Sequence, residues 1–262
     1  MAKFIIKRLI MLIPVVLGVT IVIFTLMFVV PGDAAELILG TGASRQEIEE
    51  KRDEMGLNDP YIVQLGRYMY NVFLRFDFGE SYYTNKSVTQ EMMKRMPNTL
   101  ILGFTSMVLS LVIGVPLGII AAVKQNSFGD HVSMVVALVG VSMPSFWLGL
   151  LLVALFAVRL GWVEPYGIEH WTGFIIPCVA MAFSGIAGLA RQSRSSMLEV
   201  IRADYNTTAR AKGLSEREII VNQALPNALL PIITIAGSQF SHIFGGSVVI
   251  ETVFSIPGVG MY

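Results

Sequence analysis

The stretch TLILGFTSMVLSLVIGVPLGIIAAV, residues Thr99–Val123, decides the class of fold, because none of its residues is Asp, Glu, Lys or Arg. A helix needs about 20 apolar residues to cross the hydrocarbon core of a bilayer. The whole chain of 262 residues is 54% hydrophobic and 15% charged, whereas about 25% of residues are charged in typical soluble domains. The sequence therefore predicts an all-α membrane protein that crosses the bilayer several times.

Four further apolar windows set the expected number of spans. Leu9–Val30 precedes the stretch, and Val132–Val158, Trp171–Ala190 and residues 227–250 follow it. The first window is longer than the apolar core of a signal peptide, and no A-x-A cleavage site follows it. We therefore expect a transmembrane helix in 1–30 and a core with spans at about 99–123, 132–158, 171–190 and 227–250.

Basic residues in the short connections predict the orientation, because Lys and Arg are in excess on the cytoplasmic side. Three precede the first span, one follows the second, and six lie between the fourth and fifth, whereas residues 159–170 contain one Arg and two Glu. These counts place the N-terminus in the cytoplasm and residues 31–98 outside. Five spans then end outside, and we expect a sixth helix, returning the C-terminus to the cytoplasm, to be missing from this sequence.

The external segment 31–98 contains several helix boundary signals. A Ser or Thr followed three residues later by Glu or Gln forms a capping box, and Pro favours the first helical position. These signals predict three short helices, opened by Ser44-x-x-Glu47, Asp59-Pro60 and Ser87-x-x-Gln90, with Gly56 closing the first and Pro97 stopping the third. The aromatic residues of this segment suit a membrane-interface belt or a docking surface for an external protein.

Small residues and prolines within the spans predict close packing and bends. Gly114-Val-Pro-Leu-Gly118 is a GxxxG pattern and Gly237-x-x-x-Ser241 is a related small-residue pattern, both of which allow helices to approach closely. Pro116, Pro144 and Pro177 each remove a backbone donor within an apolar window, which permits a kink.

Composition and residue placement argue against several classes of function. The formal net charge of zero gives no reason to expect nucleic-acid binding, and a single cysteine excludes an intramolecular disulfide and a Cys metal cluster. An intramembrane serine protease needs Ser and His within reach, but His242 and Ser247 are five positions apart, on different faces of one helix. A channel or secondary transporter would need charged residues along its path, and the span centres contain none.

The polar residues within the spans are the remaining candidates for a transport pathway. Hydroxyl, amide and imidazole groups without charge suit the weak binding of a zwitterionic peptide. The candidates for the path or its gate are Ser142, Ser145, Ser238, Gln239, His242 and Glu251. For Glu251, at the outer end of the last span, a capping or interface role and a gate role both remain open.

The basic connection 192–226 is a structured polar element between two apolar runs. Asp204 is placed to cap a short helix that Gly213 ends, and Ser215-Glu-Arg-Glu218 is a capping box for the next helix. The predicted arrangement is helix, sharp turn, helix at the cytoplasmic face. Thr207, Thr208, Ala209 and Ala211 are small residues, which we expect to let a partner protein approach the backbone.

This connection resembles the EAA loop of ABC importer permeases, written E-A-A-x3-G-x9-I-x-L-P. Four positions match, namely Ala209, Gly213, Leu225 and Pro226, while Thr207, Thr208 and Gln223 depart from it. Other segments are similar to the dipeptide, oligopeptide and nickel subgroup of these permeases: Ile6-Lys-Arg-Leu9, Pro31-Gly-Asp33, Asp77-Phe-Gly79, Pro97-Asn-Thr-Leu100, Ser142-Met-Pro-Ser-Phe-Trp-Leu-Gly149 and Glu251-Thr-Val-Phe254. The resemblance covers essentially the whole chain.

The resemblance implies the fold of a type I ABC importer permease and a role in translocating dipeptides or oligopeptides, with nickel or a metal chelate as the alternative cargo. It implies a bacterial or archaeal inner membrane, a second and related permease subunit, a solute-binding protein outside, and two cytoplasmic ATPase subunits that bind ATP and Mg²⁺. The chain has no G-x4-G-K-[ST] phosphate loop of its own. The residues that would contact the ATPase are Asp204, Tyr205, Thr208, Ala209, Arg210, Ala211, Lys212, Gly213 and Leu214.

Overall fold

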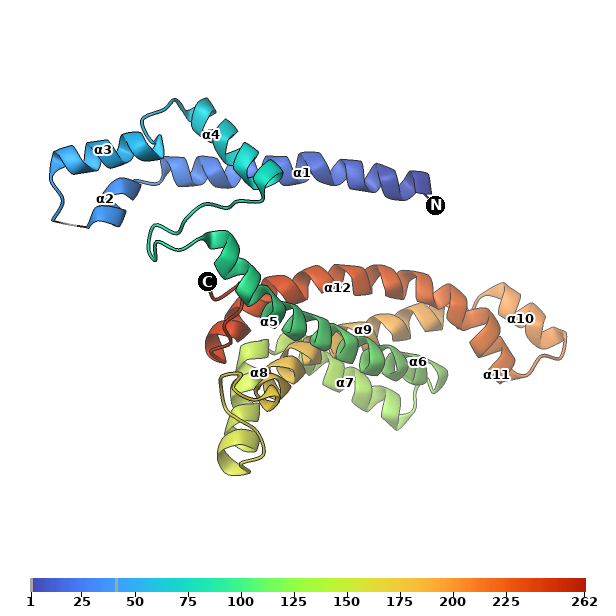
Figure 1. Cartoon of the computed structure of the whole chain (residues 1–262). Coiled ribbons are helices and arrows are strands. Elements are labelled where there is room, and N and C mark those ends of the chain that lie inside the picture. Colours follow the sequence, from blue (N-terminus) through green and yellow to red (C-terminus); the bar gives the residue numbers. More distant parts are fainter. Residues whose placement is uncertain (1, 41) are drawn as a thin grey trace. The chain divides into compact units, whose positions relative to one another are not determined.

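The computed structural model describes residues 2–40 and 42–262, with the side chains of residues 2, 4, 242 and 243 outside that description (Figure 1). The described chain is helical, and its one β-bridge, between Glu80 and Ser87, is isolated. This confirms the predicted all-α fold. The chain divides into two compact units, Met1–Lys94 and Arg95–Tyr262.

The first unit contains one long apolar helix and several short polar ones. Its elements are α1 (Ala2–Val29), α2 (Ala34–Leu39), α3 (Arg45–Met55), α4 (Tyr61–Tyr70) and the π-helical turn η1 (Asn71–Arg75). Within this unit α4 packs on α1 through aromatic rings: Tyr61 contacts Phe24 and Phe28, and its hydroxyl lies 2.6 Å from Thr25 Oγ1.

The predicted capping box of α3 is confirmed. The Glu47 N–H donates to Ser44 Oγ at 3.3 Å, and the Ser44 N–H donates to the Glu47 carboxylate at 2.7 Å. The backbone hydrogen bond from Ser44, with a second from its hydroxyl, lowers the pKa of Glu47. Gly56 ends the helix in a left-handed conformation, as expected.

Two boundary predictions in the external segment are wrong. Asp59 does not cap α4, because Pro60 holds the N-cap position and the Asp59 carboxylate pairs instead with Arg67. Pro97 does not stop a helix: α5 (Val88–Leu109) starts after Ser87, as expected, but continues through Pro97. A proline can stay in a long helix when one missing hydrogen bond is offset by the packing of the rest.

The second unit contains the remaining helices. They are the rest of α5, π-helical η2 (Ser110–Gly114), α6 (Val115–Val123), α7 (Phe128–Ser142), α8 (Ser145–Leu152), π-helical η3 (Val153–Arg159), 3₁₀-helical η4 (Trp171–Phe174), α9 (Ile175–Ile201), α10 (Asp204–Ala211), α11 (Glu216–Glu218), π-helical η5 (Ile219–Ala224) and α12 (Leu225–Val253).

The membrane-spanning helices follow the apolar windows, with one interruption. Four continuous helices of the described chain are long and apolar enough to cross a bilayer, and the pair Phe128–Ser142 and Ser145–Arg159 is bent by 105°. The span expected over 132–158 is therefore made of two helices joined at a sharp bend, at the site where Pro144 was predicted to permit a kink. The break falls at Met143-Pro144, where the missing proline N–H cannot continue the ladder of hydrogen bonds. Pro177, in contrast, lies in the first turn of α9, where no kink results.

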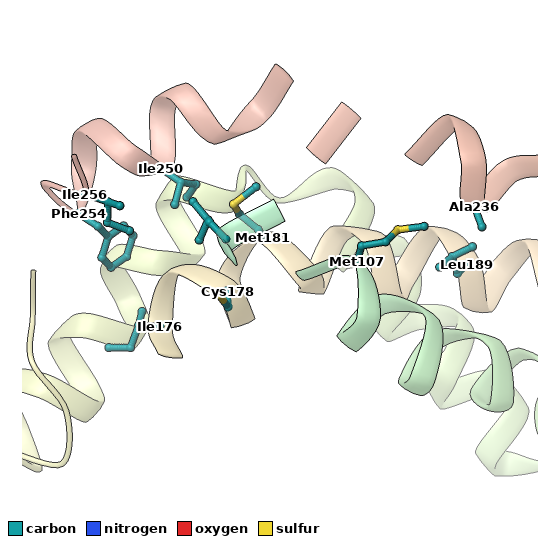
Figure 2. Close-up of a cluster of buried hydrophobic side chains, with 10 residues drawn as sticks. Met107, Ile176, Cys178, Met181, Leu189, Ala236, Ile250, Phe254 and Ile256 are labelled. Atoms are coloured by element: carbon teal, nitrogen blue, oxygen red, sulfur yellow. The ribbon is translucent and has the colours of Figure 1, made fainter. Parts of the chain in front are cut away.

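Helix α9 is the centre of the second unit, because α6, α7, α8 and α12 all pack against it (Figure 1). Figure 2 shows buried apolar side chains from α5, α9, α12 and the segment after α12, labelled Met107, Ile176, Cys178, Met181, Leu189, Ala236, Ile250, Phe254 and Ile256. Helix α9 also extends to Ile201, beyond the expected end of its span at 190.

The two small-residue patterns have different surroundings in the structure. A Cβ atom added at Gly114 would lie 2.7 Å from the carbonyl oxygen of Ile186, and one at Gly118 would lie 2.2 Å from that of Ala190. The GxxxG pattern, with Gly114 at the end of η2 and Gly118 in α6, therefore lies in close contact with α9. At Gly237, apart from the adjoining residues and the backbone of its own helix, no described atom lies within 4 Å of the added Cβ, so Gly237 makes no close contact with another described helix of this chain.

Candidate functional site

The polar connection between α9 and α12 forms the predicted helix, turn and helix. Helix α10 ends at Ala211, and Gly213 follows with a φ of +83°, a left-handed conformation that glycine adopts without strain. The Ser215 capping box then opens α11, since the Glu218 N–H donates to Ser215 Oγ at 3.3 Å and the Ser215 N–H donates to the Glu218 carboxylate at 2.9 Å. The chain continues through η5 into α12 without a break.

The start of α10 differs from the prediction. Ala203 holds the N-cap position and makes no side-chain bond, and Asp204 is the first helical residue. Its carboxylate still stabilises the helix, because a negative charge in the first turn interacts favourably with the helix dipole. The Asp204 carbonyl accepts a hydrogen bond from the Thr208 hydroxyl at 3.1 Å.

Helix α10 has an inward and an outward face. Asn206 is fully buried and Ala209 is 8% exposed, so both lie against the rest of the chain. The Asn206 Nδ2 donates to the carbonyl of Val200 at 2.7 Å, which ties α10 to the last turn of α9. The side chain of Ala209 is thus largely covered by its own chain, and its contact with a partner stays a prediction.

Apart from Ala209 and Leu214, all residues predicted to contact the ATPase are exposed in this loop. Asp204, Tyr205, Thr208, Arg210, Ala211, Lys212 and Gly213 are all exposed, as is Thr207, and Leu214 is half-buried. On a helix, Thr207, Thr208 and Ala211 lie on one face, opposite Asn206 and Ala209. We call this set of three the outward face of α10.

An ion pair closes the turn after α10. The Arg210 Nε donates to Glu216 Oε1 at 2.6 Å, and a second guanidinium nitrogen donates to Oε2 at 3.2 Å. The hydrogen bond to Glu216 raises the pKa of Arg210. This two-point geometry orients α10 relative to α11 and restricts the turn at Gly213.

The loop is joined to the bundle through a small apolar cluster. Ala224 of η5 and Ala228 and Ile232 of α12 are buried together with Ala122 of α6 and Met197 of α9. Displacement of the loop therefore changes packing against α6 and α9 directly.

The predicted pathway residues do not form a shared polar site among the described residues. Ser142 donates to the carbonyl of Leu138 at 3.0 Å and Ser238 to that of Ile235 at 2.8 Å, so each hydroxyl is satisfied within its own helix. Gln239 lies against α9, where its amide would meet a Cβ added at Gly188. The His242 side chain lies outside the described part of the chain.

The bend between α7 and α8 lies beside an open pocket of about 540 Å³. Ser142 is among its lining residues, whereas Ser145 is not, and the other lining side chains include Leu138, Met143 and Trp147. The pocket is largely apolar. Of the predicted pathway residues, the structure thus places only Ser142 at a described pocket.

Glu251 holds a structural position at the end of α12. It is fully buried and accepts a hydrogen bond from Thr99 Oγ1 at 2.7 Å and one from the Met261 N–H at 3.1 Å. The Val259 N–H donates in turn to Thr99 Oγ1 at 2.9 Å. These bonds fix the segment after α12 over the start of the α5 span, which supports the capping interpretation of Glu251 over the gate interpretation.

Gly258→Ala is expected to displace this segment, because an added Cβ would lie 2.3 Å from Glu251 Cδ and within 2.5 Å of both carboxylate oxygens. The measurement is the labelling rate of a cysteine introduced at Val259, in protein whose Cys178 is replaced by Ala. We expect faster labelling in the variant. Gly245→Ala is the matched control, since no described atom lies within 4 Å of its Cβ. Equal labelling in all three proteins would contradict the fixed position of this segment.

Sequence patterns missed two polar contacts near the cytoplasmic loop. The first is the hydrogen bond from Asn206 to the carbonyl of Val200, for which an amide within the short helix α10 was the available signal. The ion pair between Asp130 and Arg194 was also missed. Its signal was present, because opposite charges at the predicted cytoplasmic ends of two spans are placed to meet. Among the described residues, no three His, Cys, Asp or Glu side chains lie close enough to hold a metal ion.

Comparison with known proteins gives matches over the whole chain. Residues 114–262 match the family described as the binding-protein-dependent transport system inner membrane component, and residues 1–103 match the family described as the N-terminal part of such a membrane component. Both family descriptions are of membrane proteins.

Several curated proteins are also similar to this chain in sequence over nearly its full length. The dipeptide transport system permease protein DppB of Alkalihalophilus pseudofirmus is 39% identical over 290 residues, covering 100% of this chain and 87% of that protein. A putative peptide transport system permease protein of Brucella abortus is 42% identical over 268 residues, covering 99% and 85%. The glutathione transport system permease protein GsiC of Escherichia coli is 40% identical over 260 residues, covering 99% and 85%.

A solved structure has a related fold. A chain of the MetNI methionine ABC transporter, in an inward-facing conformation, aligns with a TM-score of 0.53 and 21% sequence identity. The alignment covers 66% of this chain and 78% of that chain. At this identity the likeness concerns the fold alone.

Proposed function

This chain belongs to the family of binding-protein-dependent transport system inner membrane components, and from that premise we propose that it is the permease subunit of an ATP-driven peptide importer. The observation that supports this most directly is the similarity, over nearly the full chain, to permeases named for dipeptide, peptide and glutathione transport. Glutathione is itself a tripeptide. These names favour peptides over nickel or a metal chelate as cargo.

The energy for transport comes from other subunits in this proposal. The sequence has no phosphate-binding loop for ATP, so two cytoplasmic ATPase subunits bind ATP and Mg²⁺. The outward face of α10, defined by Thr207, Thr208 and Ala211, is the surface that contacts them. Because α10 is tied to α9 by Asn206, a push on α10 is passed to the centre of the bundle.

The remaining partners follow from the same family membership. A second permease subunit, related to this chain but distinct from it, completes the pathway across the inner membrane. A solute-binding protein on the external side delivers the peptide. The largely apolar helices lie in the lipid bilayer, and specificity for the peptide resides mainly in the binding protein.

Uptake by the complete system tests the proposed function. The chain is produced with its partner permease, ATPase subunits and binding protein in cells that lack other peptide importers, and entry of a radiolabelled dipeptide is measured. We expect uptake that requires this chain and is lost on ATP depletion. Uptake of radiolabelled nickel ion with no uptake of peptide would overturn the peptide assignment.

Cysteine labelling tests the proposed orientation, with the N-terminus in the cytoplasm. In intact cells producing protein with Cys178 replaced, a cysteine at Glu49 is expected to react with a membrane-impermeant reagent, whereas one at Glu216 is expected to react only after the cells are opened. Both side chains are exposed in the structure, so accessibility within the chain does not limit either reaction. The reverse pattern would overturn the orientation and, with it, the contact between α10 and the ATPase.

A further inference from the structure

The start of α7 contains a buried carboxylate with a precise set of partners. Asp130 is 2% exposed. Its own N–H donates to Ser127 Oγ at 3.2 Å, and its Oδ2 accepts from the Asn126 N–H at 3.0 Å. These bonds cap α7, so the position of Asp130 is fixed relative to the helix it begins.

Arg194 of α9 binds this carboxylate at two points. Its Nε lies 2.5 Å from Asp130 Oδ1, and a terminal nitrogen lies 2.7 Å from Oδ2. A planar guanidinium that binds both oxygens of a carboxylate fixes the direction of approach as well as the distance. The start of α7 is therefore held to α9 in one orientation.

The partner helix α9 is the one that leads directly into the cytoplasmic loop. Arg194 lies seven residues before α9 ends at Ile201, and α10 begins at Asp204. The Asn206 bond to Val200 ties the two helices together. Arg202 also donates to Gln125 Oε1 at 3.1 Å, which joins the connection before α7 to the end of α9.

The other end of α7 is held to α9 by close packing. A Cβ added at Gly140 would lie 2.9 Å from Ala187 Cβ and 3.0 Å from a ring carbon of Phe183. Helix α7 then ends at Ser142, where the chain bends by 105° into α8 beside the open pocket. Because α7 contacts α9 at both ends, a rotation of α9 moves the bend.

We propose that Asp130 and Arg194 are positioning residues that pass motion of the cytoplasmic loop from α9 to the bent α7–α8 span. The inference rests on the proposed function as a permease driven by partner ATPases. It differs from a purely stabilising role, because a buried ion pair often contributes little net stability compared with neutral side chains of similar volume. What the pair provides is a fixed orientation between two helices.

The test uses the complete complex, reconstituted with its ATPase subunits and binding protein in lipid vesicles. Three quantities are measured for each variant: the amount of assembled complex, the rate of ATP hydrolysis and the rate of dipeptide uptake. Asp130→Asn keeps an oxygen for the Asn126 N–H, and Arg194→Gln removes the guanidinium. For both, we expect the ATP hydrolysed per peptide transported, measured per assembled complex, to rise by about fivefold or more, even where removal of one partner of the buried ion pair lowers the amount of complex.

Two further variants separate the effect of two-point binding by Arg194 from the effect of its positive charge. Arg194→Lys keeps the positive charge but cannot bind both oxygens in one plane, and we expect an intermediate ratio of hydrolysis to transport. Arg191→Gln removes the same charge from an exposed position on the same helix, and we expect a wild-type ratio.

Different outcomes would overturn the role proposed for the ion pair and the proposed function. If hydrolysis and uptake fall together in proportion to the amount of assembled complex, the pair only holds the fold and the proposal is overturned. The proposal is equally overturned if Arg191→Gln raises the ratio as much as Arg194→Gln. A wild-type complex that hydrolyses ATP without moving any peptide would overturn the proposed function itself.

Discussion

Gly118→Ala is expected to destabilise the second unit strongly, although it adds a single methyl group. The new Cβ would lie 2.2 Å from the carbonyl oxygen of Ala190, 2.6 Å from Ser193 Cβ and 2.9 Å from the backbone nitrogen of Arg194. Two of these three atoms belong to the backbone of α9. Neither can rotate away, so α6 and α9 must separate.

The expected loss of stability is large for such a small change. Overpacking a tight core costs about 1–3 kcal/mol and occasionally more, and a methyl group at 2.2 Å from a backbone oxygen belongs at the upper end of that range. Alanine favours a helix over glycine by about 1 kcal/mol, which offsets only part of this cost. Separation would also weaken the small cluster of Ala122, Met197 and Ala224 that joins the cytoplasmic loop to the bundle.

Gly237→Ala is the matched control. It makes the same change within another membrane helix, but no described atom lies within 4 Å of the new Cβ, so we expect folding at the wild-type level or slightly better. The measurements are the yield of monodisperse protein in detergent and its thermal unfolding midpoint. Comparable yields and midpoints for Gly118→Ala and Gly237→Ala would show that the two helices do not pack as closely as the structure indicates.

The sequence was sufficient to predict the features that depend on a single segment. Apolar windows identified the spans, since the length of a window and its lack of charge are local properties. The Ser44 and Ser215 capping boxes are confirmed for the same reason, because each depends on residues three apart in the chain. Gly213 was likewise predictable, since a left-handed residue after a short helix favours glycine.

Features that depend on distant segments were not predictable from these patterns. The role of Glu251 requires Thr99 and Met261, which only the folded chain brings to its carboxylate. The continuation of α5 through Pro97 depends on packing along the rest of that helix, which outweighs the local signal to stop. The burial of Ala209 was not predictable because α10 is short and has few apolar residues. Such a helix has no clear apolar stripe, so the sequence does not indicate which face of α10 points inward.

Ala211→Trp is expected to abolish peptide uptake while leaving the permease folded. Ala211 lies on the outward face of α10 and is exposed, so an indole there fits in the isolated chain. In the proposed assembly the same indole prevents close approach of the ATPase subunit. We expect at least about a tenfold weaker association, which corresponds to about 1.4 kcal/mol.

Ala209→Trp and Gly213→Val are expected to abolish uptake for a different reason. Ala209 is only 8% exposed, so a tryptophan there forces α10 away from α9 and breaks the bond between Asn206 and Val200. Gly213 has a φ of +83°, and a residue with a Cβ costs about 1–2 kcal/mol in that conformation. Both changes distort the loop itself, and limited trypsin digestion at Arg210 and Lys212 is expected to become faster.

Together, these measurements distinguish a loop that contacts the ATPase subunits from one that only connects α9 to α12. ATPase association, ATP hydrolysis, dipeptide uptake and trypsin sensitivity are measured for each variant, with Thr84→Trp as a control that adds the same indole to an exposed position in the first unit. If α10 transmits force, Ala211→Trp loses association and uptake but keeps wild-type digestion, because its defect lies at the contact with the ATPase and the loop itself stays intact. Wild-type association and uptake in Ala211→Trp would mean that the outward face of α10 touches no partner, since an indole on a covered face must weaken the complex that covers it.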